Sequence, residues 1–229
     1  MKKILICLTA LVLVFSVGCA KKEESGLAFK KDYESVNGKE NSHGKLHREL
    51  DIPEDNVFEV SSASEIVKKI ENKDTFYVYF GSKLCPWCRS TIVKANEVAK
   101  AKGVSKIYYV DIWDNDGNEI LRDKYTLDDK NKPVLDKEGT KEYKKLLEAF
   151  DSLLSDYTLT DKDGKTIQVG EKRIYAPNFI YIEKGVAKKL VTGLSDKLKD
   201  SRDELTKEIL DDEEKIYNDF FTEVCRDAC

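Results

Sequence analysis

The feature that most constrains this chain is a pair of cysteines that follows a strongly apolar segment. Residues 75–80 read Thr-Phe-Tyr-Val-Tyr-Phe, and β-branched and aromatic side chains in such a run are typical of a buried strand. The loop 81–84 leads to Cys85-Pro86-Trp87-Cys88, which opens a helix that runs to about residue 102 and ends at Gly103. The sequence therefore predicts a buried strand that delivers two cysteines to a helix N-terminus.

This placement predicts two different thiols. The N-terminus of a helix carries partial positive charge and unpaired N–H groups, which favour a thiolate over a thiol. Cys85 lies at that end and is expected to be an exposed nucleophile. Cys88 lies one turn further along, where it is shielded yet close enough to resolve a mixed disulfide.

The neighbouring residues fit the same interpretation. Pro86 suits the first helical turn, where a missing N–H costs nothing. We expect Lys83 and Arg89 to lower the pKa of Cys85 further, and Trp87 to present an exposed apolar face to a substrate polypeptide. A structural bridge remains open as an alternative, whereas half of a zinc site is disfavoured because no second Cys-x-x-Cys stands at finger spacing.

The first nineteen residues have the layout of an export signal. Lys2 and Lys3 precede an apolar run over residues 4–17, and Gly18-Cys19 follows. The ending Val17-Gly18-Cys19 resembles the lipobox of bacterial lipoproteins, although Ser16 stands where leucine is usual. That resemblance implies acyl chains, palmitate included, on Cys19 and a protein held outside the cytoplasm on the cell membrane. Cleavage near Ala20 and free secretion is the alternative.

The export signal reduces the number of cysteines that can form disulfides in the mature protein. Cys7 leaves with the signal and Cys19 carries lipid, so the pairs 85/88 and 225/229 remain. In an exported protein such pairs favour dithiol–disulfide chemistry over metal binding. Cys225 and Cys229 are candidates for a second disulfide, which staples the C-terminus or, less simply, relays electrons to the first pair.

Composition divides the mature chain into three parts. Residues 20–56 are polar and predict a tether with a loosely packed arm, in which His43 and His47 are expected to be solvated rather than metal ligands. Residues 57–221 form the structured domain, with a final helix over 196–221 and an excursion over residues 114–173 that contains a helix and a hairpin around Asp163-Gly164. Residues 222–229 form a tail.

Three segments in this order resemble the thioredoxin family. They are the active-site segment Tyr79–Cys88, the loop Ala176-Pro177-Asn178-Phe179 and the hairpin that begins with Phe179–Gly185. The resemblance covers residues 57–221 and implies an α/β fold, in which helices flank a central mixed sheet and a helix-plus-hairpin insertion precedes the proline strand. It also implies a cis Ala176–Pro177 bond whose backbone holds an extended substrate beside the sulfurs.

The chain departs from this family at two places. Where the thioredoxins have a buried aspartate six residues before the first cysteine, this chain has Tyr79. Its Pro-Trp dipeptide matches neither the Gly-Pro of cytosolic reductases nor the Pro-His of strongly oxidising periplasmic enzymes. The proton chemistry must therefore differ, and the direction of electron flow stays open.

With 39 basic and 43 acidic side chains, a net charge of −4 gives no reason to expect nucleic acid as a partner. We expect a membrane-anchored thiol–disulfide oxidoreductase that acts on exported polypeptides. The cysteine pair is the redox centre, so no bound cofactor or metal is expected, but a membrane or extracytoplasmic redox partner must regenerate it. The alternative is a binding or export-accessory lipoprotein with a static bridge, whose excursion forms the functional surface.

Overall fold

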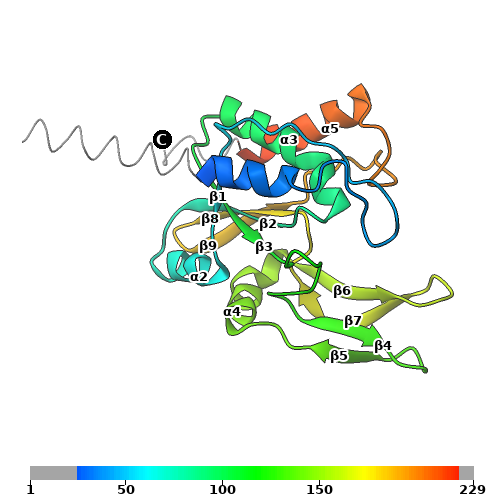
Figure 1. Ribbon diagram of the computed structural model, residues 1–229. Helices are drawn as coiled ribbons and strands as arrows, with labels where there is room; N and C mark the ends of the chain where they lie inside the picture. Colours follow the sequence, from blue (N-terminus) through cyan, green and yellow to red (C-terminus); the bar gives the residue numbers. More distant parts are fainter. Residues whose placement is uncertain (1–24, 222–229) are drawn as a thin grey trace, which may run out of the picture.

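The computed structural model describes residues 25–221 and is built around a mixed five-stranded sheet (Figure 1). The strand order is β1-β3-β2-β8-β9, in which β1, β3 and β2 run parallel and β8 and β9 are antiparallel to their neighbours. The strands span Phe58–Val60 (β1), Phe76–Gly81 (β2), Ile107–Asp111 (β3), Asn178–Glu183 (β8) and Val186–Val191 (β9). The expected α/β architecture with a mixed central sheet is confirmed.

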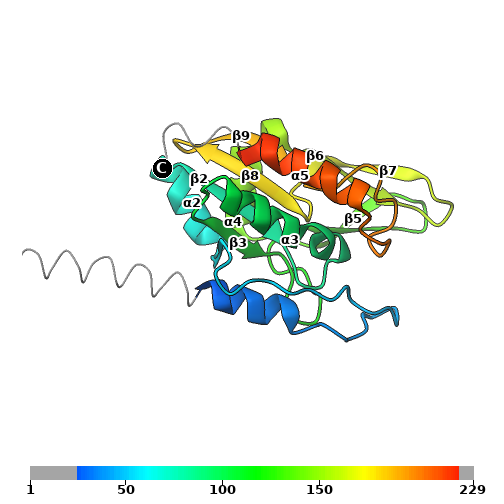
Figure 2. The same cartoon turned by 90° about the horizontal axis from the view of Figure 1, so that it is seen from above.

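Helices cover both faces of this sheet (Figure 2). A helix over residues 25–34, α3 (Pro86–Ala101) and α5 (Lys207–Phe221) lie on one face, and α2 (Ala63–Glu71) and α4 (Lys141–Phe150) lie on the other. Because β2 is buried along its whole length, its alternate side chains serve both layers. Tyr77 and Tyr79 enter the core below α3, and Val78 and Phe80 enter the core below α4.

The final helix begins later than expected. The sequence predicts a helix from residue 196, but α5 starts at Lys207. The segment 193–206 lies instead along α3, where Gly193 accepts a hydrogen bond from the Thr91 hydroxyl and Ser201 accepts one from Ser90.

The excursion between β3 and β8 contains α4, a short 3₁₀ turn Asp151–Leu153 and two antiparallel hairpins. One hairpin pairs β4 (Lys124–Leu127) with β5 (Pro133–Lys137), and the other pairs β6 (Ser155–Thr160) with β7 (Thr166–Arg173). They lie side by side at the end of the molecule remote from α2 (Figure 1). The sequence predicted α4 and the second hairpin but not the first.

The N-terminal arm is not the loose segment that the sequence suggested. Phe29 and Tyr33, on the helix 25–34, are fully buried in the same core as α3 and α5. Leu50 and Ile52 join that core further along the arm. Apolar side chains four apart on a helix share one face, so this pattern could have revealed a packed helix inside a polar segment.

Several expectations concern residues outside the described range. These are the signal and its lipidation site Cys19, and the pair Cys225 and Cys229. Within residues 25–221, no helix combines the length and apolarity needed to cross a membrane. The same range contains no cluster of metal-ligating side chains; His43 is exposed, whereas His47, expected to be solvated, is buried.

Candidate functional site

The two cysteines lie at the start of α3, directly after β2. Cys85 is the N-cap residue: its Sγ accepts a hydrogen bond from the backbone N–H of Cys88 at 3.4 Å. The same Sγ lies 3.6 Å from the carbonyl oxygen of Ala176, to which it donates as a thiol. The Ala176–Pro177 bond is cis. The structure thus brings together the helix tip and the proline loop, although 91 residues separate them in sequence.

The expectation that Cys85 is an accessible sulfur is wrong. Cys85 is only 3% exposed and Cys88 is fully buried. The proline-loop backbone approaches the first sulfur closely, and the half-buried side chains of Trp87 and Trp113 pack against the core cluster that contains it. Trp87 is therefore also less exposed than the sequence suggested.

The two thiols nevertheless have opposite acid–base properties. A hydrogen bond from Cys88 lowers the pKa of Cys85 against the effect of burial, and the backbone N–H groups of Cys88 and Trp87 and the charge of Arg122 act in the same direction. Burial raises the pKa of Cys88 well above its ordinary value, and its hydrogen bond with Cys85 adds to this rise. Cys85 is therefore the thiol that ionises first, as a nucleophile must.

The two cations expected to lower the pKa of Cys85, Lys83 and Arg89, bind other groups instead. Lys83 Nζ lies 2.6 Å from both Asp32 Oδ1 and Asn115 Oδ1, so it joins the arm to the start of the excursion. Arg89 is buried and donates to the carbonyl oxygens of Tyr33, at 2.7 Å, and Arg48, at 2.8 Å. Adjacency in sequence misled the prediction because Lys83 lies in the loop before α3 and Cys85 is its N-cap residue with an extended backbone, so the one-face rule for helical residues does not apply to either pair.

The positive charge that lowers the pKa of Cys85 belongs to Arg122, in the excursion. Arg122 and Arg173 are buried and both donate to the carboxylate of Glu119, which leaves one positive charge in excess. The Nη1 of Arg122 also donates to the carbonyl oxygen of Ile174 at 3.1 Å, just before the proline loop. In a chain with 36% charged residues, nothing local distinguishes these three side chains, and sequence reasoning missed them.

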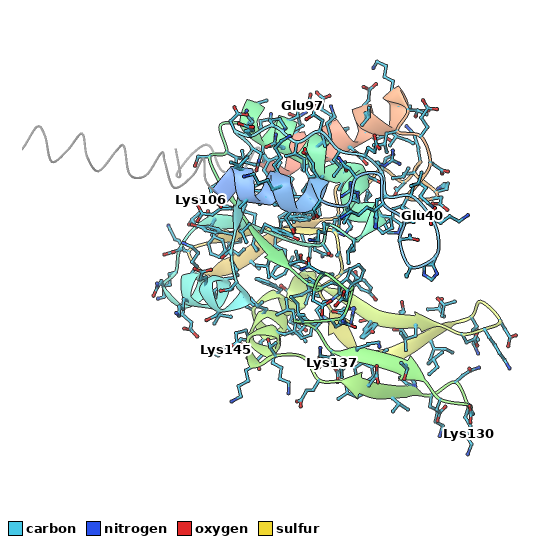
Figure 3. All side chains as sticks on the ribbon, viewed as in Figure 1. Glu40, Glu97, Lys106, Lys130, Lys137 and Lys145 are labelled. Carbon is cyan, nitrogen blue, oxygen red and sulfur yellow. The ribbon has the colours of Figure 1, made fainter. Side chains whose placement is uncertain are left out.

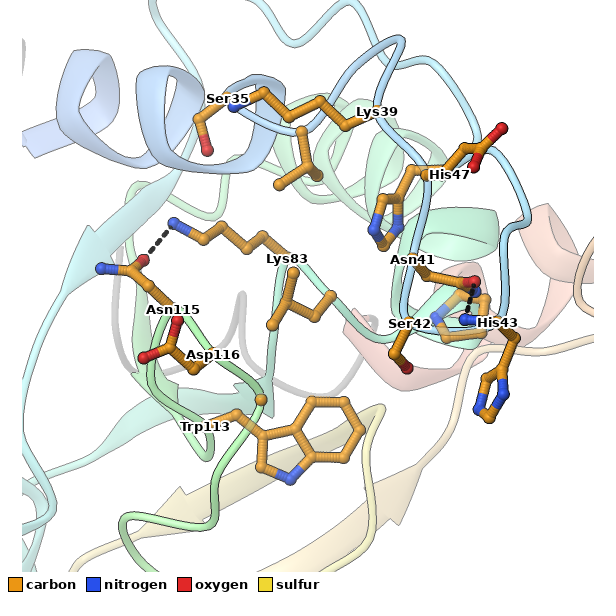
Figure 4. Close-up of a pocket in the computed structure, with 15 residues that line it drawn as sticks. Ser35, Lys39, Asn41, Ser42, His43, His47, Lys83, Trp113, Asn115 and Asp116 are labelled. Carbon is orange, nitrogen blue, oxygen red and sulfur yellow. Dashed lines mark hydrogen bonds between the residues drawn. The ribbon is translucent and has the colours of Figure 1, made fainter.

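A cavity of about 760 Å³ opens beside the cysteine loop (Figure 4). Arm residues 35–47 form one wall, Trp113 and residues 115–117 form the other, and Leu84 and Pro86 belong to the cysteine loop itself. Lys83 crosses toward Asn115 within this space, and His43 and His47 stand on the arm side. The cavity is therefore bounded by three segments that meet only in the folded chain.

Tyr79, where the family has an acid, also belongs to the site. Its hydroxyl lowers the pKa of the neighbouring Cys88 thiol, and it lies 2.9 Å from the hydroxyl of Tyr33 on the N-terminal helix. The four-residue spacing of Phe29 and Tyr33 could have indicated a packed helix, but not that Tyr33 contacts Tyr79.

Taken together, the arrangement offers an ionisable sulfur at a helix tip, a second sulfur one turn behind it and a backbone carbonyl opposite. Such a site can exchange thiols for disulfides, and it can equally hold a closed disulfide. Comparison with known proteins does not decide between these two: no protein-family model matches the chain, and no curated protein matches it.

Proposed function

We propose that this protein is a membrane-anchored thiol–disulfide oxidoreductase that acts outside the cytoplasm on exported polypeptides through Cys85 and Cys88. The observation that carries the proposal is the 3.6 Å approach of Cys85 Sγ to the carbonyl oxygen of Ala176, across a cis proline bond. This geometry puts a low-pKa sulfur next to a backbone on which an extended polypeptide can be aligned.

The topology supports the thioredoxin-like part of the proposal. The strand order β1-β3-β2-β8-β9, with the cysteines after the central strand β2 and the cis proline before β8, is compatible with the family that the sequence resembles. The excursion enters between β3 and β8, so it interrupts neither the strand that delivers the cysteines nor the helix that follows them.

The proposed reaction has two steps. The Cys85 thiolate attacks a substrate disulfide, an S–S bond forms between Cys85 and the substrate, and the displaced substrate sulfur leaves with the electron pair and takes up a proton. Cys88 then loses its proton and attacks the Cys85 sulfur, which releases the second substrate sulfur as a thiol. The substrate is reduced and the protein oxidised; the reverse sequence oxidises a substrate dithiol, and a redox partner restores the starting state.

A Cys88→Ser variant tests this function. It should keep the attacking sulfur but lack the resolving one, so extracytoplasmic polypeptides should accumulate on Cys85 as mixed disulfides that disappear under reduction. A Cys85→Ser/Cys88→Ser variant is the matched control. If Cys88→Ser captures no more protein than this control, the exchange function is contradicted.

One observation favours a second candidate, a non-catalytic binding or export-accessory lipoprotein. Cys85 is only 3% exposed, which suits a static bridge. The reduction potential separates the two candidates. A structural disulfide lies below about −300 mV, whereas an exchanger is less reducing than that value.

A further inference from the structure

The environment of the resolving sulfur, that of Cys88, disfavours the thiolate that its reaction requires. Cys88 is fully buried, and burial raises its pKa well above the ordinary value, yet it must carry negative charge as it attacks. Two neighbouring groups lower this pKa against the effect of burial, the hydroxyl of Tyr79 and the backbone N–H of Ser82. Of these two, the Tyr79 hydroxyl is the one that a side-chain substitution can remove.

The Tyr79 ring is held in one place. It is stacked on Phe179 with ring centroids 4.4 Å apart and on Tyr109 at 5.5 Å, and it is fully buried. A Cβ atom on Gly81 would lie 2.2 Å from the Tyr79 hydroxyl. The hydroxyl therefore occupies the space that this glycine leaves, inside the buried cluster that also contains Cys88.

Tyr33 sets the direction of the hydrogen bonds. Its hydroxyl lies 2.9 Å from that of Tyr79, and both rings are fully buried. Burial raises the pKa of both phenols well above the ordinary value, so both keep their single proton. When Tyr79 donates its proton to the Cys88 sulfur, its oxygen is free to accept from Tyr33. The chain Tyr33 to Tyr79 to Cys88 then polarises in one direction.

We propose that Tyr79 is a catalytic residue of the resolving step, donating a hydrogen bond to the Cys88 thiolate, and that Tyr33 is the positioning residue that orients it. The inference rests on the proposed function. In this step the bond between Cys85 and Cys88 forms, the bond between Cys85 and the substrate breaks, and the substrate sulfur takes up the proton that Cys88 loses. Tyr79 neither gains nor loses a proton.

This role predicts that Tyr79 acts on the second step and leaves the first unchanged. The reduced protein is mixed with dithiobis(nitrobenzoic acid), a disulfide that releases one coloured thiolate when Cys85 attacks and a second when Cys88 resolves. Tyr79→Phe should release the first equivalent at the wild-type rate. The second should be slower by roughly tenfold or more, as expected for a lost hydrogen bond to a charged group.

The pH profile provides a readout that packing alone would not move. The rate of the second release should depend on a higher apparent pKa in Tyr79→Phe, because the Cys88 thiolate has lost a donor. Tyr33→Phe should shift both quantities in the same direction by less. Tyr109→Phe is the matched control: this ring is also buried and stacked on Tyr79, and the variant should behave as wild type.

Each outcome has one meaning. A wild-type second release in both Tyr79→Phe and Tyr33→Phe would overturn the inference and leave the proposed function standing. If Tyr79→Phe fails to fold, Tyr33→Phe decides alone, since it leaves the Tyr79 ring in place. If the wild-type protein itself never releases a second equivalent, the proposed function fails instead.

Discussion

The N-terminal arm (residues 25–56) and the excursion (residues 114–173) both extend the central domain, but they are attached in opposite ways. The arm contributes Phe29 and Tyr33 to the core and is bound along its length by hydrogen bonds from Arg89. The excursion is anchored through α4 and the Glu119–Arg122–Arg173 cluster, whereas its β5 strand leaves Val134 and Leu135 exposed.

This contrast extends to the chemistry. The arm acts on the resolving thiol: Tyr33 contacts Tyr79, and Tyr79 lowers the pKa of Cys88. The base of the excursion acts on the attacking thiol, because the charge of Arg122 lowers the pKa of Cys85. Each thiol is therefore influenced by a different addition to the sheet. Position along the chain did not reveal this division, because the arm looked like a tether and the excursion looked remote.

The largest expected effect tests whether the arm is part of the core. Phe29→Ala removes a fully buried ring that contacts Tyr33, Phe58 and Tyr109, and should lower the free energy of unfolding by about 3–5 kcal/mol. Leu135→Ser on the excursion should change it by less than about 0.5 kcal/mol. Urea unfolding curves of both variants measure the difference. Equal effects would mean that the arm is no better integrated than the excursion.

The next effect tests what holds the arm. Arg89→Met keeps much of the side-chain volume but leaves the carbonyl oxygens of Tyr33 and Arg48 without their buried donor, and should cost about 2–4 kcal/mol. It should also make the arm susceptible to proteolysis before the rest of the domain unfolds. Arg202→Met, which removes an exposed pair with Asp200, should leave the free energy of unfolding close to that of wild type.

The pH dependence of stability tests a buried carboxyl group on the same side of the sheet as the arm. Glu213 on α5 is fully buried, and burial raises its pKa to about 8; the groups that face it are Thr91, Lys94, Arg48 and the backbone of Ser195. The folded state holds this proton more tightly than the unfolded state. The contribution of this proton to the free energy of unfolding is therefore fully present below the ordinary glutamate pKa and is lost as pH rises to about 8.

Glu213→Gln should remove that loss. The free energy of unfolding of wild type should fall between pH 4 and pH 8, whereas that of the variant should not. We expect the difference between variant and wild type to be roughly 2–3 kcal/mol larger at pH 8 than at pH 4. Thermal unfolding across this pH range measures it. A wild-type stability that is flat between these pH values would contradict a buried proton on Glu213.

The smallest expected effect concerns the base of the excursion. Arg122→Gln removes a positive charge that lowers the pKa of Cys85, so this pKa should rise. The pH dependence of alkylation of reduced protein measures it. Lys130→Gln, at the exposed tip of the first hairpin (Figure 3), is the control and should leave the Cys85 pKa unchanged. The opposite pattern would place the charge effect in the hairpins rather than at their base.

The parts of the site that follow from local rules were predictable. The aromatic run of β2, the proline in the first turn of α3 and the glycine after it determine where the two sulfurs lie. The cis bond before Pro177 came from a family resemblance and is present. Arg122 stands in no distinctive local pattern. The spacing of Phe29 and Tyr33 indicates a packed helix, but no local rule shows that Tyr33 lies near the cysteines, because that contact forms only in the folded chain.

The close approach of Gly81 to the Tyr79 hydroxyl has an evolutionary consequence. A side chain at position 81 and a phenol at position 79 cannot coexist on this strand without displacing the ring. The two positions should therefore covary in related sequences: chains with alanine or serine at 81 are expected to carry a smaller residue, or an acid, at 79.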